Sequence, residues 1–299
     1  MNRRTFLTFL PSMFFSPAIL RYLNLSEMDS IFCEEDKLIF KKEIEFAKNR
    51  GLFNEPIGKL ITEIAKSFVG VKYMRNPIEP DGEERLVVNL RSFDCVTLCE
   101  SALVIARCIK KEMLEFDEFV KELEFVRYRN GVIDGYASRL HYTTDYFFNN
   151  QEKGVLKDIT KEINGVQFRK KINFMSENAK LYPKLNKSKK NLEEIKKVEI
   201  KINNRKIYYI PKNQISKISG KIQDGDIIGI ATFIKGLDCS HTGIAIWLKG
   251  KLHMIHASIY SGKVEITDCT LKEYVNSNSR NAGIIVARPL EVKETVFRS

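Results

Sequence analysis

One segment joins a helix start, a broad apolar face and a cysteine, and it constrains the fold of the whole chain. Residues 93–100 read FDCVTLCE, and apolar residues continue at helical spacing to about residue 112. Asp94 is a good N-cap, so the pattern predicts a helix over residues 95–112 with Cys95 in its first turn. So broad an apolar face must be covered, and the helix is therefore expected to pack in the core.

The position of Cys95 suits a nucleophile. Free amide groups and the dipole at a helix N-terminus stabilise a thiolate, which is the form of cysteine that attacks carbonyl carbons. The ordinary alternative is a buried, unreactive thiol. The segment DCSHTGIAI at residues 238–246 supplies a candidate base, His241, and favours the catalytic interpretation.

Only four histidines are available to act with Cys95. If Lys249 and Gly250 form a two-residue hairpin loop, His241 and His256 lie diagonally on one face of the sheet, about 7–8 Å apart. His253 then points away, whereas a three-residue loop would reverse that assignment. The shorter loop predicts His241 as the base and His256 as the residue that orients it.

The oxyanion of such a reaction needs hydrogen-bond donors. The backbone amide of Cys95 is one, and Tyr73 is the predicted second, although a tyrosine often only packs with its hydroxyl at the surface. No cofactor or metal is expected, because attack by a Cys–His pair needs neither, and the chain has no CxxC pair for zinc. A zinc site built from Cys95, His241 and His256 is the weaker alternative.

The remaining pattern predicts an α+β fold, with helices in the first half and a meandering sheet in the second. Residues 136–150 lack periodicity and read as a functional loop. Helices are expected over residues 36–48, 54–70 and 116–128 and from 271, and a hairpin over 198–210. Strands are expected over residues 85–90, 227–232, 242–248, 252–257, 264–267 and 283–288.

The N-terminus predicts export. Arg3 and Arg4 precede a short apolar run, so residues 1–25 are interpreted as a signal peptide, possessing features of a twin-arginine signal. An uncleaved segment associated with the membrane is the alternative. The protein is thus expected in the periplasm, with residues 26–299 as one domain. The six cysteines match no disulfide framework and are expected to be mostly buried thiols.

Positive charge is concentrated in a basic insertion at residues 180–221. The chain carries a net charge of +11, and the insertion holds thirteen Lys or Arg and three Glu, a net charge of +10. Such a region suits nucleic acid, an anionic membrane or an anionic wall polymer, or is simply a solvated insertion. No nucleic-acid motif accompanies it, so no nucleic-acid partner is expected, and no stable protein partner is predicted.

Several motifs carry a resemblance to known families. Four of them resemble, in order, those of NlpC-type papain-like cell-wall cysteine peptidases: GVKY at residues 70–73, FDC at 93–95, HTGIAI at 241–246 and IHA at 255–257. A further set resembles the N-acetylmuramoyl-L-alanine amidase-like family: LVVNL at 86–90, FDCVT at 93–97, SRLHYTTD at 138–145 and QDGDII at 223–228. The resemblance spans about residues 51–289.

The resemblance implies a papain-like core in which the cysteine helix packs on an antiparallel sheet. It implies hydrolysis of the amide between N-acetylmuramic acid and L-Ala in peptidoglycan fragments, with a leaning towards anhydro-muropeptides. Carried over by motif, Cys95 is the nucleophile, His241 the base, His256 the orienting residue and Tyr73 an oxyanion donor.

The same resemblance implies a substrate-binding loop. It places Arg139, His141 and Tyr142 beside the substrate, where an arginine suits a carboxylate. Asp94 and Ser240, which adjoin the nucleophile and the base, are predicted to line the substrate site as well.

One departure narrows the activity. Many NlpC-type endopeptidases read Asp-Cys-Ser-Gly at the nucleophile, and here Val96 and Thr97 follow Cys95. The serine hydroxyl that helps to receive a free L-Ala amine in those enzymes is missing, which counts against cleavage after a γ-D-Glu and favours the amidase. An acyltransferase or a stem-peptide endopeptidase with the same site is the alternative, and a non-catalytic wall-binding protein is a third.

Overall fold

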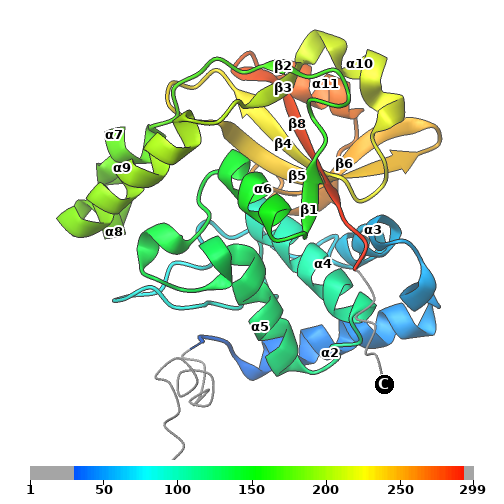
Figure 1. The fold of residues 1–299 in the computed structure, drawn as a ribbon. Helices are drawn as coiled ribbons and strands as arrows, with labels where there is room; N and C mark the ends of the chain where they lie inside the picture. Colours follow the sequence, from blue (N-terminus) through cyan, green and yellow to red (C-terminus); the bar gives the residue numbers. More distant parts are fainter. Residues whose placement is uncertain (1–29, 293–299) are drawn as a thin grey trace, which may run out of the picture.

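The computed structural model describes residues 30–292, and these form a layer of helices beneath an antiparallel sheet (Figure 1). The predicted α+β fold is confirmed. The predicted signal peptide lies outside the described residues, and across residues 30–292 no helix is long and apolar enough to cross a bilayer. The longer helices are α2 (Glu34–Asn49), α3 (Ile57–Ser67), α4 (Cys95–Lys110), α5 (Phe116–Arg127), α6 (Thr143–Glu152) and α9 (Lys189–Asn203).

The strands follow the order β2-β3-β8-β4-β5-β6-β7, with β1 also paired to β8. Every pairing is antiparallel. The strands are β1 (Leu156–Asp158), β2 (Val166–Gln167), β3 (Tyr208–Pro211), β4 (Ile227–Thr232), β5 (Cys239–Leu248), β6 (Lys251–Ser258), β7 (Lys263–Ile266) and β8 (Asn281–Pro289). The five strands expected from residue 227 onwards are therefore all present.

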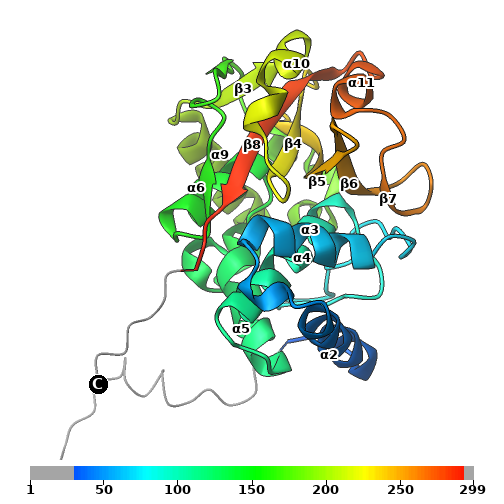
Figure 2. The same cartoon turned by 90° about the vertical axis from the view of Figure 1, so that its right-hand side faces the viewer.

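Helix α4 is the centre of the larger core. Its residues 97–109 are all buried, and the apolar residues among them share one cluster with Ile244 of β5 and Ile255 of β6. Figure 2 shows α3 and α4 beneath this part of the sheet. Burying so many large apolar side chains stabilises the packing by roughly 1.5–3 kcal/mol for each fully buried side chain.

The opposite face of the sheet is covered by two short helices, α10 (Ile215–Ile218) and α11 (Leu271–Asn276). Ile228, Ile230 and Met254 form a second apolar cluster there with residues of both helices. The sheet is thus buried on both faces, and its central strand β4 is buried at every position.

Two predictions of β-structure are wrong. Residues 198–210 do not form a hairpin, because Ile195, Val198 and Ile202 lie on one buried face of α9 while Ile200 is exposed. The alternation that suggested a strand was one part of a helical period. Residues 85–90 form only an isolated bridge, between Ile31 and Val87, so no strand develops there.

The expected loop over residues 136–150 contains a helix, α6. The sequence did not indicate this helix, because several of its buried positions are polar. These polar side chains are bonded to other parts of the chain. Asp145 accepts ion pairs from Arg129 and Arg205, and the Asn150 amide donates to the carbonyl of Val126. Polar tertiary contacts therefore stabilise α6, in place of the apolar face that usually reveals a helix in a sequence.

The basic insertion is folded. Tyr136 and Tyr142 pack in a third apolar cluster with Leu185 and with the buried face of α9. The lysines of α9 therefore lie on a helix that is anchored to the domain.

Candidate active site

The first turn of α4 holds Cys95 in a defined position. The Asp94 carboxylate accepts hydrogen bonds from the amides of Val96 and Thr97 at 3.0 and 2.8 Å, and the Thr97 hydroxyl accepts one from the Asp94 amide. Phe93 is fully buried against the ring of Phe68. The cysteine therefore enters the helix from a fixed backbone, and the Asp94 carboxylate is engaged in capping.

Removing this cap is expected to destabilise the fold. Asp94→Ala should lower the free energy of unfolding by about 1–2 kcal/mol, because two helix amides lose their acceptor. Asp94→Asn keeps an acceptor oxygen and should recover most of the loss. Urea unfolding monitored by circular dichroism measures both, and equal stability of the alanine variant and the unchanged protein would contradict the capping role.

The β5–β6 hairpin brings two histidines together as predicted. Leu248 pairs with Lys251, so the loop has two residues, and both Lys249 and Gly250 have the positive φ that such a turn requires. Nε2 of His241 lies 2.8 Å from Nδ1 of His256, with the rings perpendicular.

The third histidine of this hairpin, His253, is bonded elsewhere. Its Nδ1 lies 2.8 Å from the Thr267 carbonyl. The alternation of side chains along β6 places it on the opposite face from His256. The geometric prediction that separated these two histidines is therefore confirmed.

Two contacts join the cysteine helix to the rest of the site. The hydroxyl of Thr242, the residue after His241, donates to the backbone carbonyl of Cys95 at 2.8 Å. On the other side, the segment of Tyr73 pairs with Phe93, just before the cysteine. Burial raises the pKa of Tyr73, and the neighbouring Cys95 and Asp94 raise it further. Cys95, His241, His256 and Tyr73 therefore belong to one neighbourhood.

Burial sets the resting protonation of this site. It raises the pKa of Cys95 to about 11, with the Asp94 charge as a second cause. It lowers the pKa of His241 to about 3, and the neighbouring His256 lowers it too. Desolvation therefore outweighs the helix N-terminus, and the free site holds a neutral thiol and a neutral imidazole rather than the expected stabilised thiolate.

Two residues of this neighbourhood escaped the sequence prediction. The ring of Tyr274, on α11, lies 5.1 Å from that of His256 and 6.1 Å from that of His241. Glu265 pairs with His256 across β6 and β7, and its Oε1 lies 3.6 Å from Nε2 of that histidine. The register of the β6–β7 hairpin could have indicated Glu265, because it pairs this residue with His256. No local pattern in the sequence marks Tyr274.

The loop residues predicted to contact substrate have different surroundings. Arg139 is buried and forms ion pairs with Glu79 and Glu84. The Tyr142 hydroxyl is also buried, donating to Glu199 and accepting from the amide of Met175. Both side chains thus have protein partners, which is consistent with a part in shaping the loop.

The two other residues predicted to contact substrate are His141, which lies beside the cysteine helix, and Ser240, which lies at the surface. His141 lines a cavity of about 30 Å³ together with Val96 and Thr242, and burial lowers its pKa to about 3. Ser240 is exposed beside His241.

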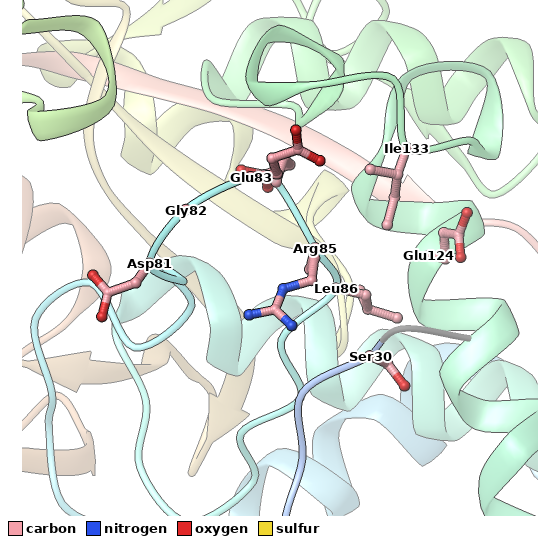
Figure 3. A pocket seen from close by; sticks show the side chains of 9 residues that line it. Ser30, Asp81, Gly82, Glu83, Arg85, Leu86, Glu124 and Ile133 are labelled. Atoms are coloured by element: carbon pink, nitrogen blue, oxygen red, sulfur yellow. The ribbon is translucent and has the colours of Figure 1, made fainter. Parts of the chain in front are cut away.

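A larger pocket of about 460 Å³ lies elsewhere and contains none of the predicted site residues (Figure 3). Asp81, Glu83 and Glu124 give it an acidic lining. Among residues 30–292, no group of three or more His, Cys, Asp or Glu side chains is arranged to hold a metal ion.

Comparisons with known proteins place the chain in a family. Residues 63–284 match the family model described as AmiA-like, N-acetylmuramoyl-L-alanine amidase-like. A crystal structure of an N-acetylmuramoyl-L-alanine amidase from Bacteroides uniformis is similar at 34% identity and a TM-score of 0.75, covering 78% of this chain and 99% of its own. A search of curated proteins finds no match.

Two further solved structures share the fold. One, described as a putative xylanase from Bacteroides fragilis, is 35% identical, with a TM-score of 0.71 and coverage of 75% of this chain and 98% of its own. The other, from Legionella pneumophila, is 24% identical, with a TM-score of 0.66 and coverage of 86% and 95%. The chain belongs to the N-acetylmuramoyl-L-alanine amidase-like family.

Proposed function

We propose that this protein is a cysteine amidase with a papain-like, NlpC-type core. Its substrate is the amide between N-acetylmuramic acid, including its anhydro form, and the L-Ala of peptidoglycan stem peptides. The observation that carries the chemistry is the junction of the Cys95 helix with β5. There the hydroxyl of Thr242, the residue after His241, donates a hydrogen bond to the Cys95 carbonyl. Nε2 of His241 lies 2.8 Å from Nδ1 of His256. Family membership supports the choice of bond.

The reaction begins from the neutral pair. As the sulfur of Cys95 attacks the lactyl carbonyl carbon, its proton passes to His241, and the carbonyl oxygen becomes an oxyanion near the Cys95 amide and Tyr73. When the tetrahedral intermediate collapses, the C–N bond breaks and His241 returns the proton to the departing L-Ala amine. Water, deprotonated by the same imidazole, then hydrolyses the thioester and regenerates the thiol.

The hydrogen bond to His256 determines which ring nitrogen of His241 accepts the thiol proton. If Nδ1 of His241 accepts the thiol proton, its Nε2 must carry hydrogen and donate to Nδ1 of His256. Nε2 of His256 then carries hydrogen too, and it faces Glu265 at 3.6 Å. This carboxylate favours the positive charge that develops on the pair during attack.

The neutral resting pair predicts a pH dependence. Alkylation of Cys95 by iodoacetamide should accelerate steadily from about pH 6 to 9, because the raised thiol pKa leaves the thiolate a minor form throughout. Peptide mapping separates Cys95 from the other cysteines. A rate already at its plateau at about pH 6 would instead indicate a preformed ion pair with His241.

The same pKa values set the acid limit of turnover. A protonated His241 cannot accept the thiol proton, so activity is lost as the pH falls through the pKa of this histidine. Since burial holds that pKa well below the usual value of a histidine, hydrolysis should persist at mildly acidic pH.

Product analysis tests the proposed bond. The protein is incubated with a defined anhydro-muropeptide, and mass spectrometry is expected to find an intact stem peptide that begins at L-Ala. Fragments cut within the stem would indicate an endopeptidase. Transfer of the muramyl group to an added amine, in place of hydrolysis, would indicate an acyltransferase.

A further inference from the structure

A groove lies at the β4–β5 turn, just before the strand that carries His241. It has a volume of about 650 Å³ and is built from residues 167–177, Tyr209 of β3 and the β4–β5 turn. Its charged lining consists of four cations, namely Arg169, Lys170, Lys171 and Lys235, against one carboxylate, Glu177. The groove is therefore strongly positive.

Three of the cations are free to bind a ligand. Arg169, Lys171 and Lys235 are exposed, and none of them has an ion-pair partner within the described residues. Lys170 has a structural role instead, since its ammonium group donates to the Thr232 carbonyl and lies over the Phe168 ring. An anion entering the groove would thus meet three uncommitted positive charges.

Apolar surface lies beside these charges. Phe233, directly after β4, is 60% exposed, and the rings of Phe168 and Tyr209 lie tilted against each other with centroids 4.6 Å apart. A ligand that fits must therefore offer aliphatic surface as well as carboxylates, as an acidic peptide does.

The groove has a rigid frame. The amides of Asn173 and Phe174 both donate to the Gly236 carbonyl at 2.9 Å. These bonds join the wall formed by residues 167–177 to the β4–β5 turn. Gly236 has a φ of +79°, and a Cβ there would lie 2.8 Å from the Asn173 side-chain oxygen. The two walls are therefore held together by the backbone before any ligand binds.

A chain of contacts links this frame to the catalytic neighbourhood. Thr232 donates its amide to the Asp238 carbonyl, and the Asp238 carboxylate accepts from the amide and hydroxyl of Thr144. The neighbouring Thr143 lines the small cavity beside Val96. This series of contacts connects the β4–β5 turn, through the start of α6, to the cavity beside the first turn of α4.

The span suits a short peptide. Gly236 and His241 are five residues apart, at most about 18 Å of extended chain, and an extended tetrapeptide covers about 13–14 Å. Gly236, at the edge of the groove, is therefore no farther from His241 than about 18 Å, which is of the same order as the length of such a peptide.

We propose that this groove binds the carboxylates of the stem peptide beyond L-Ala and so sets the preference for stem length. The inference rests on the proposed amidase function for its substrate. Arg169, Lys171 and Lys235 supply the charge, and Phe233 contacts the aliphatic part of the peptide.

Charge removal tests the groove. In the triple variant Arg169→Gln, Lys171→Gln, Lys235→Gln, KM for a muropeptide with a tetrapeptide stem should rise about tenfold relative to KM for one truncated after L-Ala. The matched control replaces Lys190 and Lys201 of α9, which line another pocket, with glutamine. An equal rise in the control, or an unchanged KM ratio in the triple variant, would overturn the proposal.

A binding measurement separates this inference from the amidase assignment. Calorimetry with the free tetrapeptide L-Ala-D-Glu-diaminopimelate-D-Ala uses the Cys95→Ala protein, with and without the three glutamine substitutions. A tenfold weaker affinity in the substituted protein supports the groove even if the unchanged protein hydrolyses no muropeptide, in which case only the amidase proposal fails. Absent or equal binding in the two proteins overturns the groove.

Discussion

Replacing Cys95 with alanine is expected to lower kcat for muropeptide hydrolysis by about 10⁴-fold or more, to the background rate. The sulfur forms the covalent bond to the lactyl carbon, and the hydroxyl of a serine variant would be a poor substitute beside the weakly basic His241. Cys95 is not a member of the apolar core cluster around α4, so the variant should fold normally. Single-turnover kinetics with a defined muropeptide measures the loss.

A matched control distinguishes chemistry from packing. Cys108 lies on the same helix, fully buried and away from its first turn. Cys108→Ala should cost about 1–2 kcal/mol of stability by leaving a small cavity, while kcat stays within a few fold. Comparable loss of kcat in the two variants would mean that the cysteines act through the helix rather than through the Cys95 thiol.

Replacing His241 with glutamine is expected to lower kcat by about 10³-fold, because the thiol then lacks a base and the leaving amine lacks an acid. Glutamine can keep a hydrogen bond to His256, so the hairpin should be retained. His253→Gln is the matched control on the other face of β6, where activity should change little. Steady-state kinetics over a pH series measures both variants, and similar activities would argue against His241 as the base.

The central parts of this site could be predicted because their signals are local. Asp94 marks the start of α4 through bonds to amides two and three residues away. Lys249 and Gly250 define the β5–β6 register, and the register alone decides which histidines share a face. The motifs around these residues also led correctly to the family.

The remaining features depend on contacts between distant segments. Helix α6 is polar but buried, and its Asp145 is stabilised by arginines from two other segments. Tyr274 reaches the histidines only because α11 folds over the sheet. The protonation of Cys95 likewise depends on how deeply the helix start is buried, which the cap and the dipole do not reveal.

The most direct test of the account is to look for the acyl-enzyme. Unchanged protein is mixed with excess anhydro-muropeptide, quenched in acid within milliseconds to seconds and mapped by mass spectrometry, alongside the Cys95→Ala protein. The account predicts a muramyl thioester on the peptide that contains Cys95, with neither adduct nor product from the alanine variant. An adduct on another residue, or continued product formation by the variant, would contradict it.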